Sequence, residues 1–541
     1  MSQMLKSTGA LGMATVLSRV LGLVREQVYA SFMGDSTVAS AFKLAYQMPN
    51  LFRRLLGEGA LTAAFIPIFK QREKAEGEAA MWEAANAVLS GLICFATFVV
   101  GLCLIGLTVV LAASSLHYVR NGQEVFPPFP IPVLHEDTRM VLRLLRLMLP
   151  YLVLVCLAAL CMGILNARGQ FFIPALSASM LNLVMIATVL FVAPHFGSEL
   201  DTQVYALALG VVVAGLAQLG FQIPVLRRLG FRFRWVNPWR NPTVREVVRK
   251  MLPAVIGVAA YQINVLVIAT VSFWIDRNIV ASFDYAVRLM EFPQGVVGIS
   301  LATYLLPTLS GLAAEQRYPE FRQNLQDGLG YLLFVNTLAS VLLLTLAEPM
   351  VRLLFERGAF TAASTHRTAL ALAGLAPGLV AFSTNNVLAR AFYALGDTKT
   401  PMRISVAGLM LNLFFAFWLI APFRQLGLGL ANTLSAYANV WLLSRALSKK
   451  MPKFDFAPLR QLLARVLVAT AVAGLVAWFG QVWWGRHVGH ATLPAKAGQV
   501  FAPMILAGIV YYAAAWLLRV PQAAEFLHLL LGRFRRARPS P

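Results

Sequence analysis

The sequence predicts an all-α polytopic membrane protein with about fourteen transmembrane helices. Two observations carry this prediction. Of the 541 residues, 58% are hydrophobic and only 13% are charged, whereas a soluble domain carries roughly a quarter charged residues. The apolar residues also gather in runs of about 20 or more, the length that crosses the hydrocarbon core of a bilayer. We expect two lobes of six helices each, followed by two additional C-terminal helices.

The apolar runs define the expected helices in chain order. The first six lie at 8–33, 37–70, 84–113, 138–166, 173–194 and 202–227. The next six lie at 247–274, 280–309, 323–347, 363–394, 400–421 and 426–447, and the last two at 460–481 and 498–519. The second and the tenth are long enough to tilt or break. We expect the second to bend near Pro49, Gly57 and Gly59, because these residue types interrupt helices.

Loop charge predicts how these helices are oriented. The connection after the sixth helix is strongly basic, with Glu246 as its single acid against Arg227, Arg228, Arg232, Arg234, Arg240, Arg245, Arg249 and Lys250. Basic residues also follow the twelfth helix and fill the C-terminal tail, whereas alternate connections contain acids such as Asp35 and Glu136. The net charge of +22 therefore follows the positive-inside rule and does not indicate a nucleic-acid partner. We expect both termini in the cytoplasm.

A weak internal repeat predicts that the two lobes share one orientation. The sequence VAS at 38–40, followed by Pro49, recurs at 280–282, followed by Pro293. Likewise, segment 166–169 resembles segment 393–396. Six helices separate the copies, and parallel repeats of this kind form transporters with a central site between the lobes. We expect an N-terminal lobe at 1–235, a second lobe at 236–452, and a C-terminal region of two helices and a basic tail at 453–541.

Charged residues interrupt the first two expected helices, where burying a charge in lipid is costly. They are Arg19, Arg25, Glu26, Arg53, Arg54 and Glu58. Helical spacing puts Arg19 on one face with Glu26, puts Ser18 with Arg25, and places Arg54 one turn from Glu58. Such residues usually face a polar interior and mark a substrate path.

The second lobe repeats this pattern with Asp284, Arg288 and Glu291, at spacings of four and three residues. The guanidinium group of arginine matches phosphate oxygens with two parallel hydrogen bonds. Because the arginines outnumber their acids, the pattern favours an anion, and a diphosphate would engage two or more arginines at once. The alternative is that these charges only pair with one another and hold helices together.

Three segments at these positions resemble one family. They are SRVLGLVRE at 18–26, PNLFRRLLGEGALTAAFIPIF at 49–69 and YAVRLMEFPQGVVGISLATYLLP at 285–307, and they are similar to the MurJ (MviN) lipid II flippases of the MATE-like exporter superfamily. The resemblance implies two MATE-like lobes around a cationic cavity, with the last two helices forming a groove for a polyprenyl tail. It also implies transport of lipid II, an undecaprenyl-diphosphate-linked glycopeptide, from the cytoplasmic to the periplasmic leaflet of the inner membrane by alternating access.

By position, the resemblance assigns substrate binding to Arg19, Arg25, Arg53 and Arg288. Supporting roles in the cavity fall on Glu26, Glu58, Asp284, Glu291, Ser18, Asn50 and Arg54. No bond is made or broken in such transport, so we expect no enzyme, no cofactor and no metal. Coupling to the membrane potential or to a monovalent cation stays open.

The expected partners are lipid II and membrane lipids, together with proteins of peptidoglycan synthesis, and we expect a monomer. Three alternatives remain. One is a flippase for another polyprenyl-diphosphate-linked glycan. A second is a drug or cation exporter of the same fold, although a cation site needs unpaired acids. The third is a membrane scaffold that recruits wall-synthesis enzymes through its basic loops.

Overall fold

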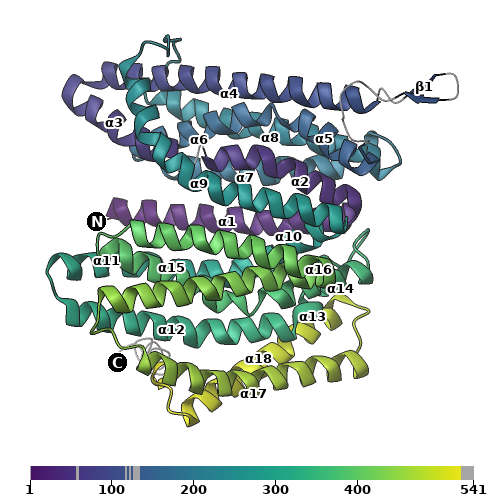
Figure 1. Cartoon of the computed structure of the whole chain (residues 1–541), viewed down its shortest axis with the longest axis vertical. Coiled ribbons are helices and arrows are strands. Elements are labelled where there is room, and N and C mark those ends of the chain that lie inside the picture. Colours follow the sequence, from purple (N-terminus) through teal and green to yellow (C-terminus); the bar gives the residue numbers. More distant parts are fainter. Residues whose placement is uncertain (1, 56–59, 116–117, 121–122, 126–133, 525–541) are drawn as a thin grey trace, which may run out of the picture. The chain divides into compact units, whose positions relative to one another are not determined.

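The computed structural model describes residues 2–55, 60–115, 118–120, 123–125 and 134–524. These residues are almost entirely helical, apart from one hairpin of β1 (Tyr118–Arg120) and β2 (Gln123–Val125). The backbone divides into two compact units, Met1–Val280 and Ala281–Pro541 (Figure 1).

Long helices build the first unit. In chain order they are α1 (Ser2–Met33), α2 (Thr37–Phe52), α3 (Ala60–Glu76), α4 (Glu78–Ser115), α5 (Glu136–Met148), α6 (Tyr151–Ala167), α7 (Phe172–Ala187), α8 (Leu200–Arg228) and α9 (Pro242–Ile275). Ser36 begins α2, because its hydroxyl accepts a hydrogen bond from the backbone N–H of Ala39, and Asn241 caps α9 in the same way. Helix α1 packs on α7, α6 on α8, and α2 on α5.

The second unit is also built from helices. They are α10 (Ile279–Pro293), α11 (Ser300–Ala314), α12 (Tyr318–Thr345), α13 (Ala347–Phe355), α14 (Ala362–Leu375), α15 (Gly378–Ala394), α16 (Lys399–Lys450), α17 (Ala457–His487) and α18 (Leu493–Leu517). Leu305, Phe321, Phe392 and Leu447 belong to a buried core between α11, α12, α15 and α16. A second core joins α17 and α18 to α12. The short helix α13 was not predicted.

The helix α16 is a hairpin of two antiparallel helices. Arg424 interrupts it with φ 48° and ψ −119°, and a Cβ atom at Gly427 would lie 2.0 Å from the carbonyl oxygen of Leu419. Across the hairpin, the amide of Asn412 donates to the hydroxyl of Ser435 at 3.2 Å. The two helices predicted at 400–421 and 426–447 therefore correspond to the two arms.

Eight described helices are long and apolar enough to cross a membrane, and two bent pairs raise this number to ten. The pairs are α5 with α6, bent by 46°, and α14 with α15, bent by 44°. The α16 hairpin is counted among these helices as one, so its second arm adds a further crossing. The predicted all-helical membrane fold is confirmed, and the total of fourteen is compatible with these spans but stays a prediction.

Local geometry supports the predicted repeat. The two bent pairs occupy corresponding places, and each break is followed by a proline, Pro150 or Pro377, at the start of the next helix. Gly169 and Gly396, which the repeat aligns, end α6 and α15 with φ of 76° and 74°, a conformation that glycine adopts without strain. A π-helical turn also follows α2 at residues 53–55 and α10 at residues 294–299.

The bend expected near Pro49 agrees with the first of these π-helical turns, while Gly57 and Gly59 lie outside the described residues. The division of the chain falls at residue 280 because α9 packs against α2, α3 and α4 of the first unit. The expected limits of the two functional lobes, at 235 and 452, stay a prediction.

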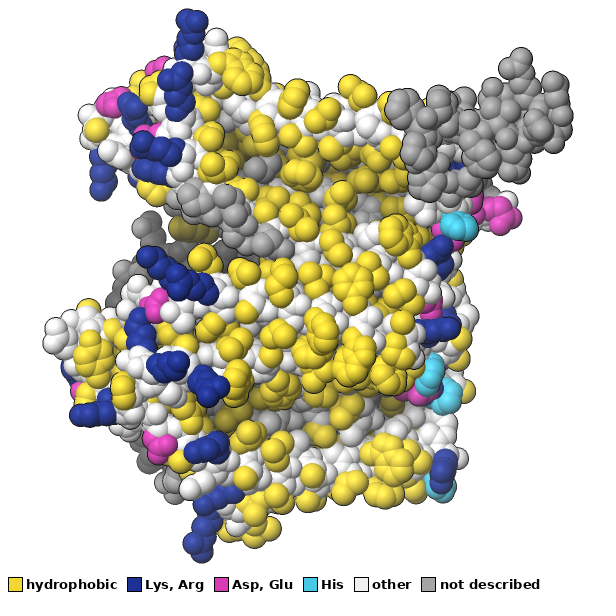
Figure 2. Space-filling view, viewed as in Figure 1, with side chains coloured by type: hydrophobic (Ala, Val, Ile, Leu, Met, Phe, Trp, Pro, Cys, Tyr) yellow, Lys and Arg dark blue, Asp and Glu magenta, His cyan; other side chains and the backbone are white. Residues whose placement is uncertain are grey.

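Figure 2 shows the surface chemistry of each unit. Hydrophobic side chains cover the middle of the helices, and lysine and arginine gather toward the end drawn on the left. Large apolar residues such as Phe98, Ile105 and Trp418 are exposed to the surroundings of the protein. This pattern is typical of helices that face lipid.

Candidate functional site

The charges in α1 and α2 form a buried network around Glu26. The Glu26 side chain accepts a hydrogen bond from Nη2 of Arg25 at 2.5 Å and from Nζ of Lys43 at 3.0 Å. Glu26 is 2% exposed and Lys43 is 7% exposed, so both carboxylate oxygens are paired away from water. Through the contact of Glu26 with Lys43, this network joins α1 to α2.

The guanidinium of Arg25 has one further N–H donor, at Nε, that is not used in this network. Its Nε is buried and has no hydrogen-bond partner among the described residues. Its guanidinium also lies 5.5 Å from the ring centre of Tyr29, a cation–π contact that holds the planar group in place. A buried unsatisfied donor costs about 1–3 kcal/mol, so an arriving anion that accepted this hydrogen bond would recover that cost.

Lys43 is the member of this network that sequence analysis missed. It lies seventeen residues after Glu26, on the next helix, inside the apolar run ASAFKLAY. A single lysine in such a run was the available signal. Its partner could not be assigned from the sequence, because the pairing depends on how α1 and α2 are rotated about their axes.

Arg53 lies on the π-helical turn that follows α2. Its Nε donates to Oδ1 of Asn50 at 2.9 Å, so the predicted supporting residue Asn50 orients it. Tyr151 on α6 is close enough to interact electrostatically with both Arg53 and Arg25, and its ring lies 6.1 Å from that of Tyr46. The structure thus brings Arg25 and Arg53 to the same region of the first unit.

The remaining first-unit candidates are not joined to this network by any described side-chain contact. Arg19 is exposed on α1, and the backbone oxygen of Ser18 accepts a hydrogen bond from the Asn182 side chain of α7. Arg54 is exposed. Glu58 lies outside the described residues, and so does the predicted pair of Arg54 with Glu58.

The second unit presents Arg288 on α10. Nη1 of Arg288 lies 3.0 Å from Oε2 of Glu291, and the two side chains are 40% and 50% exposed. Asp284 is half-buried on the same helix. Tyr285 fixes the rotation of α10, because its buried ring packs against Phe355 at 5.2 Å. An exposed ion pair of this kind contributes about 0–1 kcal/mol, so the contact with Glu291 holds Arg288 only weakly.

No group of three or more histidine, cysteine, aspartate or glutamate side chains in the described part of the chain is arranged to hold a metal ion. The cysteines Cys94, Cys103, Cys156 and Cys161 are free thiols within helices.

Apolar spanning helices, a repeated arrangement of bends and charges buried between helices are typical of polytopic membrane transporters. Two solved structures have this fold. One is entitled lipid II flippase MurJ in an inward closed conformation, with TM-score 0.72, 20% identity and coverage of 93% of this chain and 98% of that one. The other is an inward-facing multidrug resistance MATE transporter, with TM-score 0.62, 13% identity and coverage of 80% and 96%. The chain therefore has the predicted MATE-like fold.

Sequence comparison then gives the family. The family model described as lipid II flippase MurJ matches residues 29–496, and the chain belongs to this family. A probable lipid II flippase MurJ of Haemophilus influenzae is 32% identical over 475 residues, which are 86% of this chain and 90% of that protein. The lipid II flippase MurJ of Burkholderia cenocepacia is 32% identical over 515 residues, which are 93% and 95% of the two chains.

Family membership confirms the resemblance found at 18–26, 49–69 and 285–307. The protein is a multi-pass protein of the bacterial inner membrane, and it is a transporter and not an enzyme.

Proposed function

We propose that the protein moves lipid II from the cytoplasmic to the periplasmic leaflet by alternating access. The match to the MurJ family over residues 29–496 carries this proposal, and relatives with the name lipid II flippase align over almost their whole length. The cations Arg25 and Lys43, which lie beside Glu26, add a chemical reason, because cationic side chains in the protein interior favour an anion over a cationic drug.

The diphosphate of the substrate is the group that this chemistry recognises. Arg19, Arg25 and Arg53 would supply the contribution of the first unit, and Arg288 that of the second. Glu26 and Asn50 hold Arg25 and Arg53 in fixed positions before the substrate arrives, which lowers the conformational entropy lost on binding. Each arginine offers a planar pair of donors to phosphate oxygens.

Anion binding by residues of both units provides a physical basis for alternating access. A ligand shifts a conformational equilibrium only by its difference in affinity for the two states. A diphosphate bound by arginines of both units would favour the state in which they approach each other. The exposed pair of Arg288 with Glu291 can open at little energetic cost when the substrate binds.

The lipid tail and the membrane orientation complete the proposal. Helices α17 and α18 pack along each other and expose apolar side chains including Leu475, Phe479 and Ile505, which suits a polyprenyl chain. Both termini would lie in the cytoplasm, on the side of the basic connection at 227–250. The working unit would be a monomer, and contacts with peptidoglycan-synthesis proteins would involve its cytoplasmic loops.

Complementation of a strain depleted of its lipid II flippase tests this function, with lipid II in the outer leaflet measured directly. The wild-type chain is expected to restore growth and outer-leaflet lipid II. Failure of a normally inserted wild-type chain to do so would contradict the lipid II proposal and favour another diphosphate-linked glycan.

The variants R25A, R53A and R288A test the arginine clamp in the same assay. Each is expected to abolish flipping at unchanged membrane abundance. R245A is the matched control, because Arg245 is exposed at the start of α9 and belongs to none of the described ion pairs. Normal flipping by R288A would rule out the clamp, and loss of function in R245A alone would favour the scaffold alternative.

A further inference from the structure

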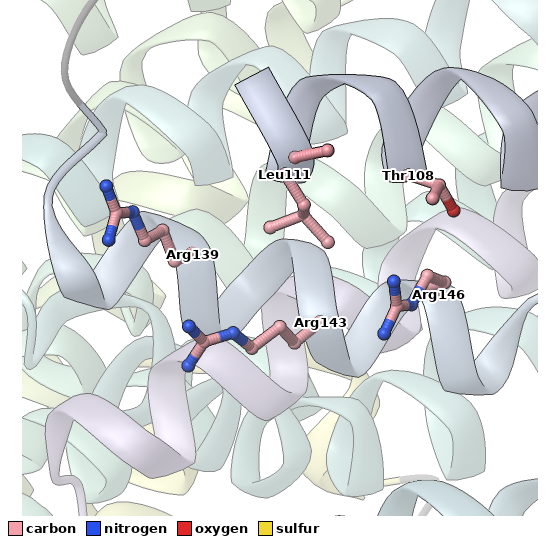
Figure 3. Close-up of a pocket in the computed structure, with 6 residues that line it drawn as sticks. Thr108, Leu111, Arg139, Arg143 and Arg146 are labelled. Carbon is pink, nitrogen blue, oxygen red and sulfur yellow. The ribbon is translucent and has the colours of Figure 1, made fainter. Parts of the chain in front are cut away.

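A separate arginine-lined pocket lies in the first unit, where the end of α4 meets α5. Its volume is about 260 Å³. Figure 3 shows three arginines along one side of α5, below the last turns of α4. The pocket is lined by Thr108, Leu111, Ala112, Arg139, Arg143 and Arg146. None of these residues belongs to the proposed transport site.

The sequence of α5 sets this arginine face. Residues at spacings of four and three lie on one side of a helix, and Arg139, Arg143 and Arg146 have these spacings. The opposite face buries Val141, Leu144, Leu145 and Met148 in the packing of α5 with α2 and α8. The arginines are therefore held toward α4 by the packing of the rest of the helix.

Positive charge exceeds negative charge at the pocket. Glu136 lies 2.8 Å from Arg143 and 3.6 Å from Arg139, while the neighbouring Asp137 pairs with Arg277 at 2.8 Å. Two of the three guanidinium groups thus share one carboxylate, and that carboxylate is 64% exposed. Exposed pairs contribute little, so a phosphate can replace Glu136 at Arg143 without a large cost.

Donors at the pocket remain available. Nη2 of Arg139 donates to the backbone oxygen of Ser114 at 2.6 Å, which fixes this guanidinium at the end of α4. Its Nε is buried and has no hydrogen-bond partner in the part of the chain that the structure describes. Figure 3 also shows Arg146 on the side of α5 that faces α4, where Thr108 lies.

The position of the pocket along α4 indicates the depth at which it lies in the membrane. Thr108 is seven residues from the last residue of α4, about 10 Å along the helix axis. The preceding turns expose Phe98, Leu102 and Ile105 and are therefore suited to acyl chains. The pocket lies at the end of a lipid-facing helix, where headgroup phosphates are found.

We propose that this pocket binds the phosphate of an anionic phospholipid. Arg143 and Arg146 donate to the phosphate oxygens, Arg139 anchors the site to α4, and the acyl chains run along the exposed face of α4. A bound phosphate bridges the ends of α4 and α5. The inference does not depend on which substrate the protein transports.

Lipid retention by the purified full-length protein tests this site. The protein is delipidated in detergent, mixed with phosphatidylglycerol, and the bound lipid is counted by native mass spectrometry. The variant R143Q/R146Q changes two exposed residues and keeps Arg139. It is expected to lose phosphatidylglycerol binding by at least about tenfold, because each charged hydrogen bond to phosphate contributes on the order of the free energy of a tenfold affinity change.

The matched control R245Q/R249Q removes the same number of exposed arginines from the start of α9 and should bind as the wild type does. R143K/R146K should recover only part of the binding, because lysine lacks the two-pronged donor geometry. Equal retention by R143Q/R146Q and the wild type would overturn the site. Equal binding of phosphatidylcholine, or displacement of the lipid by millimolar inorganic phosphate, would overturn the assignment to an anionic lipid.

Discussion

At the scale of single residues, the buried network of Glu26 has the largest energetic consequences. Its carboxylate is paired with Arg25 and Lys43 in a region with little access to water. Removing one member of a buried pair leaves an uncompensated charge and typically costs about 3–5 kcal/mol. Removing Glu26 and Lys43 together leaves one cation, Arg25, without this carboxylate instead of two. The network can therefore be tested by a comparison of single and double variants.

We expect E26A to lower the thermal stability of the purified protein strongly, because Arg25 and Lys43 are left buried without their shared carboxylate. The double variant E26A/K43M should recover part of the lost stability, since it contains one buried cation fewer beside the missing carboxylate. Thermal unfolding in detergent measures both effects, with R245A as the control. Equal unfolding temperatures of E26A and E26A/K43M would contradict the expectation that Lys43 destabilises the protein once Glu26 is removed.

The same residues show the limits of sequence reasoning at this scale. Arg25, Glu26, Arg53 and Arg288 could be selected because a charge in an apolar run is conspicuous. Their partners could not be selected in every case. Glu291 was selected together with Arg288, whereas Lys43 was not selected at all.

At the scale of elements, the hairpin in α16 depends on close approach of backbone atoms. Its turn contains Arg424 at φ 48° and Gly427, whose α-carbon has no room for a side chain. The segment APFRQLGLGL contains proline and glycine, which interrupt helices. This agrees with the prediction of two separate helices at 400–421 and 426–447.

We expect G427A to reduce the amount of folded protein in the membrane severely, because the new methyl group would overlap the carbonyl oxygen of Leu419. G508A is the matched control, since nothing lies within 4 Å of a Cβ atom at Gly508 in α18. Alanine should be neutral or stabilising there by up to about 1 kcal/mol. Fluorescence-detected size exclusion of both variants measures folded protein, and a normal yield of G427A would contradict the tight turn.

The two ends of the same hairpin are joined outside the membrane by Asp397 and Lys450, at 2.7 Å. The Lys450 ammonium and the Thr400 backbone N–H and hydroxyl hold the pKa of the Asp397 carboxyl well below its ordinary value. In the folded protein this carboxylate stays ionised at pH values where the unfolded chain is already protonated. Its stabilising effect is complete above the ordinary carboxyl pKa and is lost as the pH falls toward the lowered pKa.

Wild-type protein is therefore expected to lose thermal stability as the pH is lowered from about 6 to about 3 more steeply than D397N does. The difference should be small, because both partners are partly exposed and screened by solvent. Unfolding temperatures of the two proteins across this range measure it. Parallel curves would mean that the pair makes no pH-dependent contribution.

At the scale of the whole molecule, charge distribution predicts which side of the membrane each loop faces. The connection between α8 and α9 contains the strongest basic cluster. The connection before α8 contains Glu199, and Asp201 lies in the first turn of α8. Basic loops are retained in the cytoplasm.

A cysteine at Ser198 should react with an impermeant maleimide in intact cells whose outer membrane has been permeabilised, and a cysteine at Arg240 should react only after the inner membrane is opened. Both positions are exposed in loops. The native cysteines lie within helices, and the chain in which they are replaced by serine serves as the background. Labelling in the reverse order would overturn the proposed orientation.

The sequence by itself determined the membrane character, the helical fold, the approximate helix limits and the family. These properties follow from local composition, since a run of about 20 apolar residues spans a bilayer wherever the chain places it, and prolines and glycines end or bend helices locally. The expected helix at 138–166 was interrupted near Pro150, which its limits did not anticipate. The interruption of the tenth helix, at 363–394, near Pro377 agrees with the expectation that this helix could tilt or break.

Only the tertiary structure decided which side chains meet. The pairing of Glu26 with Lys43, the packing of α9 within the first unit and the arginine pocket between α4 and α5 join residues on different helices. Such contacts depend on the rotation and packing of each helix against its neighbours, and similar apolar faces allow many such arrangements. Hydrophobicity therefore determines which segments form membrane helices, while the packing of these helices determines which side chains form the sites.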